Sequence, residues 1–256
     1  MPITVSNQIN LSSNSATIKN SSYNSAMIFN LLTMKKEKNI LYNQVSLIHA
    51  QIPVSYYTIN ENNNKFVLST ASYTLTNGNY NATSFKTMFL NLLGSSFSMT
   101  LDVSTGKYTL SKTGGFTILS SSCYKILGIE KNKSYIVSSS LTFPYPCNFL
   151  GINRIKIKSG CFKTDNLDTF SNGHNDLLAT IPVNVSQYSL INYINYVGFK
   201  NIFHNEDINM IDITITDEED NIINFNGVDV YLTLQIDSII EDYENNNDLE
   251  ELINKI

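Results

Sequence analysis

The sequence predicts an all-β protein of the sandwich or jelly-roll type. Many short segments alternate apolar and polar residues with a period of two, and clusters of turn residues separate them. Strands do not alternate regularly with helices, as a parallel sheet would require. Eight or more such segments occur in 256 residues, a length that allows a large core. We therefore expect packed antiparallel sheets with two short helices.

The expected strands are rich in β-branched and aromatic residues. The first is long and ends near Pro53, and a hairpin farther along turns at Thr105 and Gly106. Residues 163–183 are expected to form a long polar loop. The predicted strands cover residues 40–53, 65–76, 96–104, 107–119, 152–160, 188–199, 211–216 and 228–236, with a further strand starting at 134.

Two segments have helical patterns. Residues 81–94 place five apolar side chains at helical spacing and end at Gly94, which predicts an amphipathic helix. A shorter helix is expected within 119–128, with Ser120 to Ser122 as caps and Gly128 as its end. The apolar positions of the first helix are Phe85, Met88, Phe89, Leu92 and Leu93.

The chain is expected to form one domain with two extensions. Residues 1–38 are polar and weakly periodic, which predicts an N-terminal arm. Residues 39–237 form the predicted jelly-roll domain, and 238–256 an acidic C-terminal tail or helix. The arm carries the apolar residues Met27, Ile28, Phe29, Leu31 and Leu32. We expect this cluster to dock on a neighbouring subunit; the alternative is that it packs in the core of its own chain.

Composition argues against several classes of protein. The net charge is -5 and no basic cluster is visible, which argues against specific nucleic-acid binding. No stretch has the apolar length of a membrane span, and no secretory signal is visible at the N-terminus. Cys123, Cys147 and Cys161 lack metal or redox spacing and are expected to be reduced core thiols in an intracellular setting.

No catalytic constellation is recognisable in the sequence. Gly-rich phosphate loops and a G-x-S-x-G nucleophile motif are absent. His49 is expected to be a buried or interface residue, and His174 a loop residue far in sequence from His204. No spacing singles out a carboxylate pair among Asp165, Asp168, Asp176 and the acidic run 217–220. We therefore predict no catalytic, cofactor-binding or metal-ligating residues, no cofactor, and no enzymatic activity.

The acidic run Asp217 to Asp220 is the strongest candidate for a metal site. A calcium loop beginning at Asp217 would need Gly at its sixth position and Glu at its twelfth, where Ile222 and Val228 stand. We expect the run to be a solvated loop between two strands. A weak cation site shared between loops is the alternative.

Four stretches of the sequence, at 39–64, 77–93, 125–129 and 208–236, together resemble the minor capsid, or penton, proteins of virophages and of Polinton or Maverick-type elements. The first matches the phrase A-x-I-P-x-S-[FY]-Y-x-I-N, and the others a G-N-Y helix start, an L-G-[FI] step and a closing D-x-x-x-N-x-x-x-x-G strand pair. The matching residues are Ala50, Ile52, Pro53, Ser55, Tyr56, Tyr57, Ile59 and Asn60, then Gly78, Asn79 and Tyr80, then Leu127 and Gly128, and finally Asp217, Asn221 and Gly227, the last with one more intervening residue than the phrase has.

The resemblance implies a single jelly roll of the PRD1-adenovirus lineage, with eight strands in two sheets. It implies homopentamers at the fivefold vertices of an icosahedral capsid, surrounded by trimers of a double jelly-roll major capsid protein. The chain would then be located in the virion after assembly inside the host cell. In such a fold the last two strands belong to opposite sheets, so residues 217–227 would cross between them. The alternative function is a lectin-like carbohydrate-binding module, because jelly rolls also serve as lectins.

Overall fold

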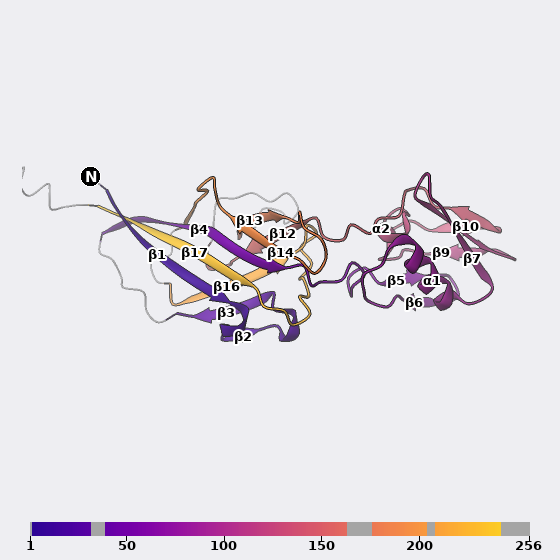
Figure 1. The fold of residues 1–256 in the computed structure, drawn as a ribbon, viewed down its shortest axis with the longest axis horizontal. Helices are drawn as coiled ribbons and strands as arrows, with labels where there is room; N and C mark the ends of the chain where they lie inside the picture. Colours follow the sequence, from indigo (N-terminus) through magenta and orange to yellow (C-terminus); the bar gives the residue numbers. More distant parts are fainter. Residues whose placement is uncertain (1, 32–38, 163–175, 204–207, 242–256) are drawn as a thin grey trace, which may run out of the picture. The chain divides into compact units, whose positions relative to one another are not determined.

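The computed structural model describes residues 2–31, 39–162, 176–203 and 208–241. Two compact units make up the chain. Unit 1 consists of residues 1–56 and 153–256, and unit 2 of residues 57–152. The prediction of one continuous domain over 39–237 is therefore wrong, because unit 2 is inserted between two strands of unit 1 (Figure 1).

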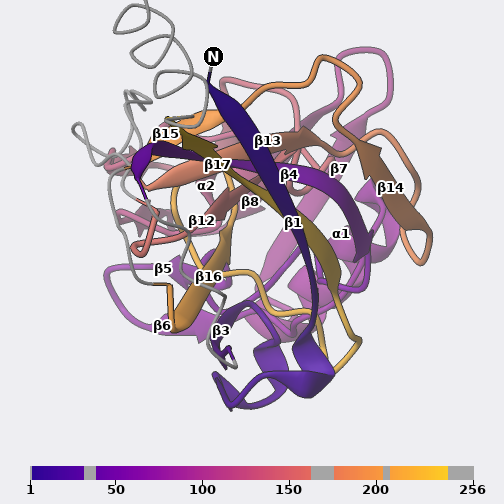
Figure 2. The same cartoon turned by 90° about the vertical axis from the view of Figure 1, so that its left-hand side faces the viewer.

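The first sheet of unit 1, sheet A, contains the two longest pairings of the fold. Its strand order is β1-β17-β4-β14, with β15 also paired to β4, and every pairing is antiparallel. Figure 2 shows β1, β17 and β4 running beside one another in unit 1. The strands are β1 Ile3–Ser12, β4 Ile40–Pro53, β14 Leu190–Ile194, β15 Asn201–Phe203 and β17 Tyr231–Ile240.

The second sheet of unit 1, sheet B, has the order β13-β12-β16-β3-β2. Its central strand β16 buries Ile211, Ile213 and Ile215, the alternation that predicted this strand. Short 3-10 helices, η1 (Ser13–Ser15) and η2 (Ser21–Tyr23), flank β2. The strands are β2 Ile18–Lys19, β3 Ala26–Asn30, β12 Arg154–Lys158, β13 Leu177–Pro182 and β16 Met210–Thr216.

The strand order identifies unit 1 as a jelly roll. When β2 with β3 and β14 with β15 each count as one position, eight strands follow one another along the chain. Sheet A then contains the first, eighth, third and sixth of these, and sheet B the fifth, fourth, seventh and second. This interleaving is that of two Greek keys wrapped into a sandwich. The last two strands, β16 and β17, lie in opposite sheets, as the resemblance implied.

The prediction of an arm over residues 1–38 is wrong for the described part of that segment. Ile3–Ser12 forms β1, and Met27 and Phe29 on β3 are only 3% and 5% exposed within unit 1. Met27 and Phe29 of the apolar cluster therefore pack in the core of their own chain, which is the alternative given above, and Leu32 lies outside the described residues. The segment has few apolar residues because β1 lies at the edge of its sheet and is largely exposed.

Other boundaries also differ from expectation. Residues 65–76 form two short paired strands instead of one, and the segment expected as a loop up to 183 contains β13. Ser238 to Ile240 belong to β17 instead of the acidic tail, and residues 242–256 lie outside the described part of the chain.

Unit 2 has its own core around helix α1, Ala82–Leu93. Phe85 and Phe89 stack at 5.3 Å between ring centroids, and Phe66 meets Phe89 edge-on at 4.9 Å. Asn81 and Ser84 form a capping box and Gly94 follows the last turn, so this helix is confirmed as predicted. The other elements are β5 Lys65–Val67, β6 Ser72–Thr74, β7 Phe97–Asp102, β8 Lys107–Lys112, β9 Phe116–Ile118, α2 Tyr124–Leu127, β10 Tyr135–Val137 and β11 Ser140–Thr142.

Candidate functional site

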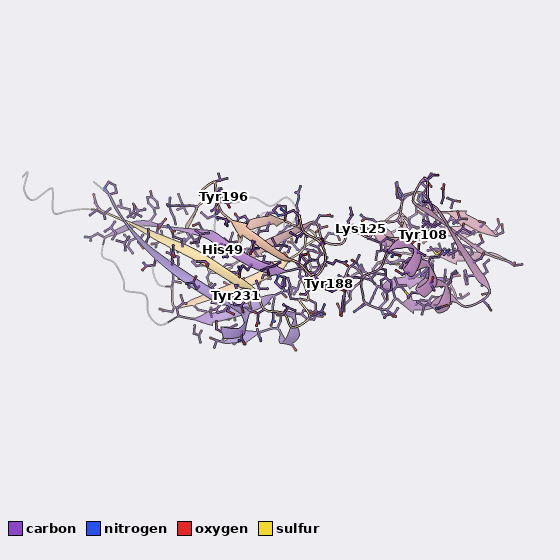
Figure 3. All side chains as sticks on the ribbon, in the orientation of Figure 1. His49, Tyr108, Lys125, Tyr188, Tyr196 and Tyr231 are labelled. Atoms are coloured by element: carbon purple, nitrogen blue, oxygen red, sulfur yellow. The ribbon has the colours of Figure 1, made fainter. Side chains whose placement is uncertain are left out.

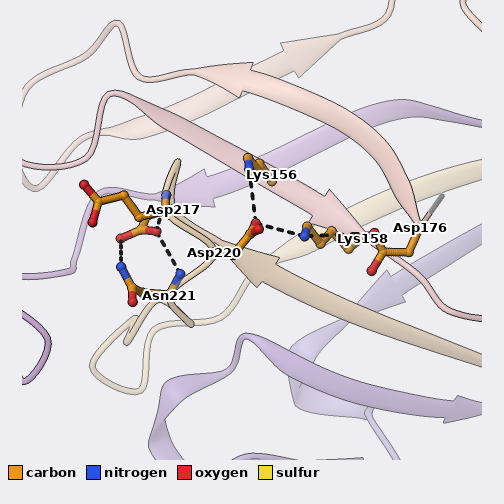
Figure 4. Close-up of polar contacts among 7 residues, drawn as sticks. Lys156, Lys158, Asp176, Asp217, Asp220 and Asn221 are labelled. Atoms are coloured by element: carbon orange, nitrogen blue, oxygen red, sulfur yellow. Dashed lines mark hydrogen bonds and ion pairs between the residues drawn. The ribbon is translucent and has the colours of Figure 1, made fainter. Parts of the chain in front are cut away.

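The acidic run does not form a freely solvated loop. Asp220 reaches over the outer face of sheet B, where its Oδ1 lies 3.1 Å from Nζ of Lys156 and 2.8 Å from Nζ of Lys158 (Figure 4). Both lysines are more than nine-tenths buried. Partial burial raises the pKa of Asp220, but hydrogen bonds from Lys158 and Lys156 outweigh it and hold this pKa below its ordinary value. Asp220 therefore neutralises two buried ammonium groups.

Asp217 shapes the same loop. Its Oδ1 accepts hydrogen bonds from the backbone N–H groups of Glu219 and Asn221 at 2.8 and 2.9 Å, and its Oδ2 accepts one from Asn221 Nδ2 at 2.9 Å. These bonds form the turn that places Asp220 over the lysines. Two of the four carboxylates in the run therefore have structural partners, and the prediction of a solvated loop is wrong for them.

The described residues contain no group of three or more His, Cys, Asp or Glu side chains arranged to hold a metal ion. His49 lies half-buried on β4 in unit 1 (Figure 3). Of the other candidates from the sequence, Asp165, Asp168, His174 and His204 lie outside the described residues. Asp176 is described, and its Oδ1 lies 3.9 Å from Lys158 Nζ.

The three cysteines are free thiols. Cys123 is fully buried, and burial raises its pKa well above the ordinary value. Burial likewise raises the pKa of Cys161 to about 11 and that of Cys147 above the ordinary range. Such thiols stay protonated at neutral pH, so their chemistry does not suit a nucleophile. Among the described residues, no helix is long and apolar enough to cross a membrane.

The residues that carry the family resemblance hold turns together. Ser55 donates its hydroxyl hydrogen to the carbonyl of Phe225 at 2.6 Å, and Asn226 Nδ2 donates to the Ser55 carbonyl at 2.7 Å. Tyr56 contacts Phe225 edge-on at 6.1 Å between centroids. The first phrase and the loop of the last phrase, about 170 residues apart, thus meet at the end of the jelly roll.

The residues of the second and third phrases also stabilise turns, within unit 2. Ile59 and Gly78 exchange two backbone hydrogen bonds, and Asn79 Oδ1 accepts a hydrogen bond from the Thr58 N–H at 2.8 Å. Gly128 has a φ of +81°, and a Cβ there would lie 2.1 Å from the Tyr145 carbonyl oxygen. Only glycine fits this position, which explains the Leu-Gly step as a backbone requirement.

Sequence reasoning missed an apolar surface on unit 1. The turn between β14 and β15 exposes Tyr196 to 85% and Val197 to 91%, and Figure 3 shows Tyr196 projecting from the unit. Phe199 is 53% exposed on the same turn. The signal was available in the sequence, because residues 184–203 contain one charged residue, Lys200. Its ammonium group lies 2.6 Å from the buried Asp237 Oδ2.

Unit 2 carries a shallow depression of about 490 Å³ beside α2. Tyr124, Tyr145 and Asn148 line it together with Lys125 and Lys131. The Nζ atoms of Lys125 and Lys131 lie 6.0 and 5.6 Å from the Tyr124 ring centroid. Aromatic rings beside hydrogen-bond donors can accept a polar ring such as a sugar.

No protein-family model matches the chain, and no curated protein matches it either. Solved structures that are similar in fold include the following two. The mavirus penton protein is 11% identical with a TM-score of 0.49, over 93% of this chain and 100% of that one. A chain of the Sputnik virophage, from its cryo-EM structure, is 12% identical with a TM-score of 0.42, over 93% of this chain and 98% of the other.

Proposed function

We propose that this chain is a structural virion protein, the penton or minor capsid subunit, which forms homopentamers at the fivefold vertices of an icosahedral capsid. The observation that carries the proposal is the complete eight-strand jelly roll of unit 1, an architecture common to viral capsid proteins. The ordered sequence phrases support it, and their residues hold the turns of both units. Fold alone does not imply function, so the test must be assembly.

A capsid role accounts for the chemistry of the described residues. Among the described residues, Asp220 neutralises two lysines, Asp217 shapes a turn and Cys123 is buried in the core of unit 2. A shell subunit needs rigid surfaces and no turnover, so neither an enzymatic activity nor a cofactor belongs to the proposal. Its partners are four further copies and the double jelly-roll major capsid protein around the vertex. Its location is the virion.

The test is the mass of the purified full chain in solution, measured by native mass spectrometry and analytical ultracentrifugation. We expect a species of five 28.8 kDa chains. Mixing this species with the major capsid protein should give closed shells in which it occupies the vertices by electron microscopy. A protein that stays monomeric at every soluble concentration and does not enter shells would overturn the proposal.

Carbohydrate binding is the second candidate, favoured by the depression beside α2. Tyr124 and Tyr145 provide ring faces, and Asn148 with the two lysines provides polar groups for an anionic or neutral glycan. Glycan-array binding of the full chain tests this candidate. Binding that Tyr145→Ala abolishes and Tyr196→Ala leaves intact would assign the activity to this depression, because Tyr196 is exposed on unit 1. An array without any bound glycan would remove the candidate.

A further inference from the structure

The β1 edge of sheet A is open to pairing. β1 pairs with β17 over ten residues without a register shift, and among the described residues it has no strand on its other side. Every second residue of an edge strand directs its N–H and C=O away from the sheet. β1 contains no Lys, Arg, Asp, Glu or Pro, the residues that usually protect a free edge. A ten-residue edge of this kind is a template for another strand.

The opposite edge of sheet A, formed by β14 and β15, carries a preorganised apolar turn. Asn195 Nδ2 donates to the Phe199 carbonyl at 2.9 Å, and its Oδ1 accepts from the Phe199 N–H at 3.1 Å. Gly198 N–H donates to the Asn195 carbonyl, and Asn195 N–H to the Ile48 carbonyl of β4. The turn is therefore fixed to the sheet while it exposes Tyr196 and Val197. A rigid apolar projection loses little conformational entropy when a partner covers it.

Charge indicates which partner can cover these edges. The chain has 17 basic residues (Lys and Arg) and 22 acidic residues. Unit 2 contains seven of the basic and three of the acidic residues, so unit 1 has 10 basic and 19 acidic residues. Copies of unit 1 therefore carry a net negative charge of the same sign and repel each other. The β1 edge carries no charge, and on the β14–β15 edge Lys200 is neutralised by Asp237. These two edges are where like-charged copies can approach.

We infer that copies of this chain join head to tail through sheet A. The β1 edge of one copy lies against the β14–β15 edge of the next, and the 195–199 turn packs on the neighbour's β1. Because the two edges lie at opposite ends of the strand order, the contact is heterologous and repeats in one direction. Such contacts close into a ring when the rotation between copies is suitable. The inference rests on the proposed pentamer and names its two contact surfaces.

The first test adds charge to one edge at a time. Val197→Asp alters the turn, and Asn7→Asp with Gln8→Glu alters β1 at two exposed positions. Val103→Asp is the matched control for the turn, since Val103 is 88% exposed in unit 2. Asn62→Asp with Asn91→Asp adds the same charge at exposed positions of unit 2. Native mass spectrometry should show loss of the pentamer in both edge variants and retention in both controls, with unchanged thermal unfolding midpoints.

The second test mixes the two edge variants. The turn variant still has an intact β1 edge, and the β1 variant still has an intact β14–β15 edge. A head-to-tail contact therefore predicts a heterodimer of the two variants that grows no further, whereas each variant alone is monomeric. The dimer is identified by its mass after one variant is labelled with heavy isotopes.

Each outcome bears on the inference separately from the proposed function. A pentameric wild type whose edge variants also remain pentameric overturns the inference and leaves the vertex function standing. Monomeric variants that form no heterodimer overturn the head-to-tail pairing. Edge variants that stay pentameric but no longer enter shells would show that these edges face the major capsid protein. A wild type that never assembles would overturn both proposals.

Discussion

Lys158 and Asp220 form an ion pair with a distance of 2.8 Å between Nζ and Oδ1, although 62 residues separate them in sequence. The lysine side chain is 10% exposed and the carboxylate 25%. Lys156 Nζ lies 3.1 Å from the same oxygen, so one carboxylate serves two ammonium groups. The acidic loop is thereby fixed to the outer face of sheet B.

Asp220→Asn should destabilise unit 1 by about 2 to 4 kcal/mol, because it leaves two buried ammonium groups without their shared anion. Chemical denaturation followed by circular dichroism measures the change. Replacing both lysines by Met together with Asp220→Leu should recover most of the loss, since the buried lysine charges are removed together with the anion that they share. If Asp220→Asn leaves stability unchanged, the network contributes nothing to the fold.

Unit 1 should lose stability in acid. Burial raises the pKa of Asp237, but hydrogen bonds from Lys200, Ser6 and Gln235 hold it below the ordinary 3.8. A depressed folded-state pKa gives stability that is fully present above the unfolded-state value and is lost as pH falls through the folded-state value. Thermal unfolding midpoints should therefore be level from neutral pH to about 5 and decline below about 4. Asp237→Asn should lower the midpoint at pH 7 and flatten the acid decline; an equally steep decline would exclude this residue as a cause.

Gly128→Ala should destabilise unit 2 by at least about 3 kcal/mol, since it combines a left-handed backbone with a backbone clash. The clash is with the Tyr145 carbonyl oxygen, which would lie 2.1 Å from the new Cβ. Gly114→Ala is the matched control, because Gly114 has a φ of +82° and no atom within 4 Å of its ideal Cβ. The control should cost only about 1 to 2 kcal/mol. Equal losses measured by denaturation would show that the contact with Tyr145 relaxes freely.

Unit 2 should fold by itself. Residues 57–152 contain a core of aromatic and aliphatic side chains around Phe85, Phe89 and Tyr108, with all its members inside this range. Expressed alone, this segment should unfold cooperatively on heating and give dispersed amide signals in NMR spectra. A non-cooperative transition would mean that the unit depends on the jelly roll.

Deleting residues 1–31 should abolish the native fold of unit 1. The deletion removes β1, which pairs with all ten residues of β17, and β3, which carries the buried Met27 and Phe29. We expect insoluble protein, or a soluble form in which only unit 2 unfolds cooperatively. A truncated protein with the full near-ultraviolet circular dichroism of both units would restore the idea of a dispensable arm.

The sequence was sufficient to predict those elements whose structure depends on the local residue pattern. Alternating isoleucines predicted β16, and Asn81 with Gly94 marked the ends of α1. The insertion was not predictable in this way, because residues 57–152 continue the pattern of short strands and turn clusters found in the segments around them. The pairings of β1, β3 and β4 with strands that follow the insertion show that the flanking segments belong together, and the pairing of β1 with β17 reaches from Ile3 to Ile240.

In the candidate site, too, the local pattern could be predicted from the sequence and the long-range contacts could not. The residue spacing excluded a helix-flanked calcium loop. The ion-pair partners of Asp220 could not be predicted from the sequence, because Lys156 and Lys158 lie on a strand more than 60 residues away. The sequence pattern predicts the exposed turn at Tyr196 as part of a strand over 188–199, since its apolar residues continue the pattern of β14. Sequence pattern identifies apolar residues, but it does not distinguish those that face the core from those that project outward.

The interleaving of early and late strands in sheet A has a consequence for synthesis on the ribosome. Unit 2 contains only residues 57–152 and can fold as soon as that stretch has emerged. β1 cannot pair with β17 until residues 231–240 have been made. The edges of β1 and β4 that pair with β17 therefore stay unpaired until then. Nascent chains on one message would therefore carry a folded insert beside unpaired strands, a state prone to mispairing between neighbours. Completion of unit 1 is thus tied to the synthesis of β17.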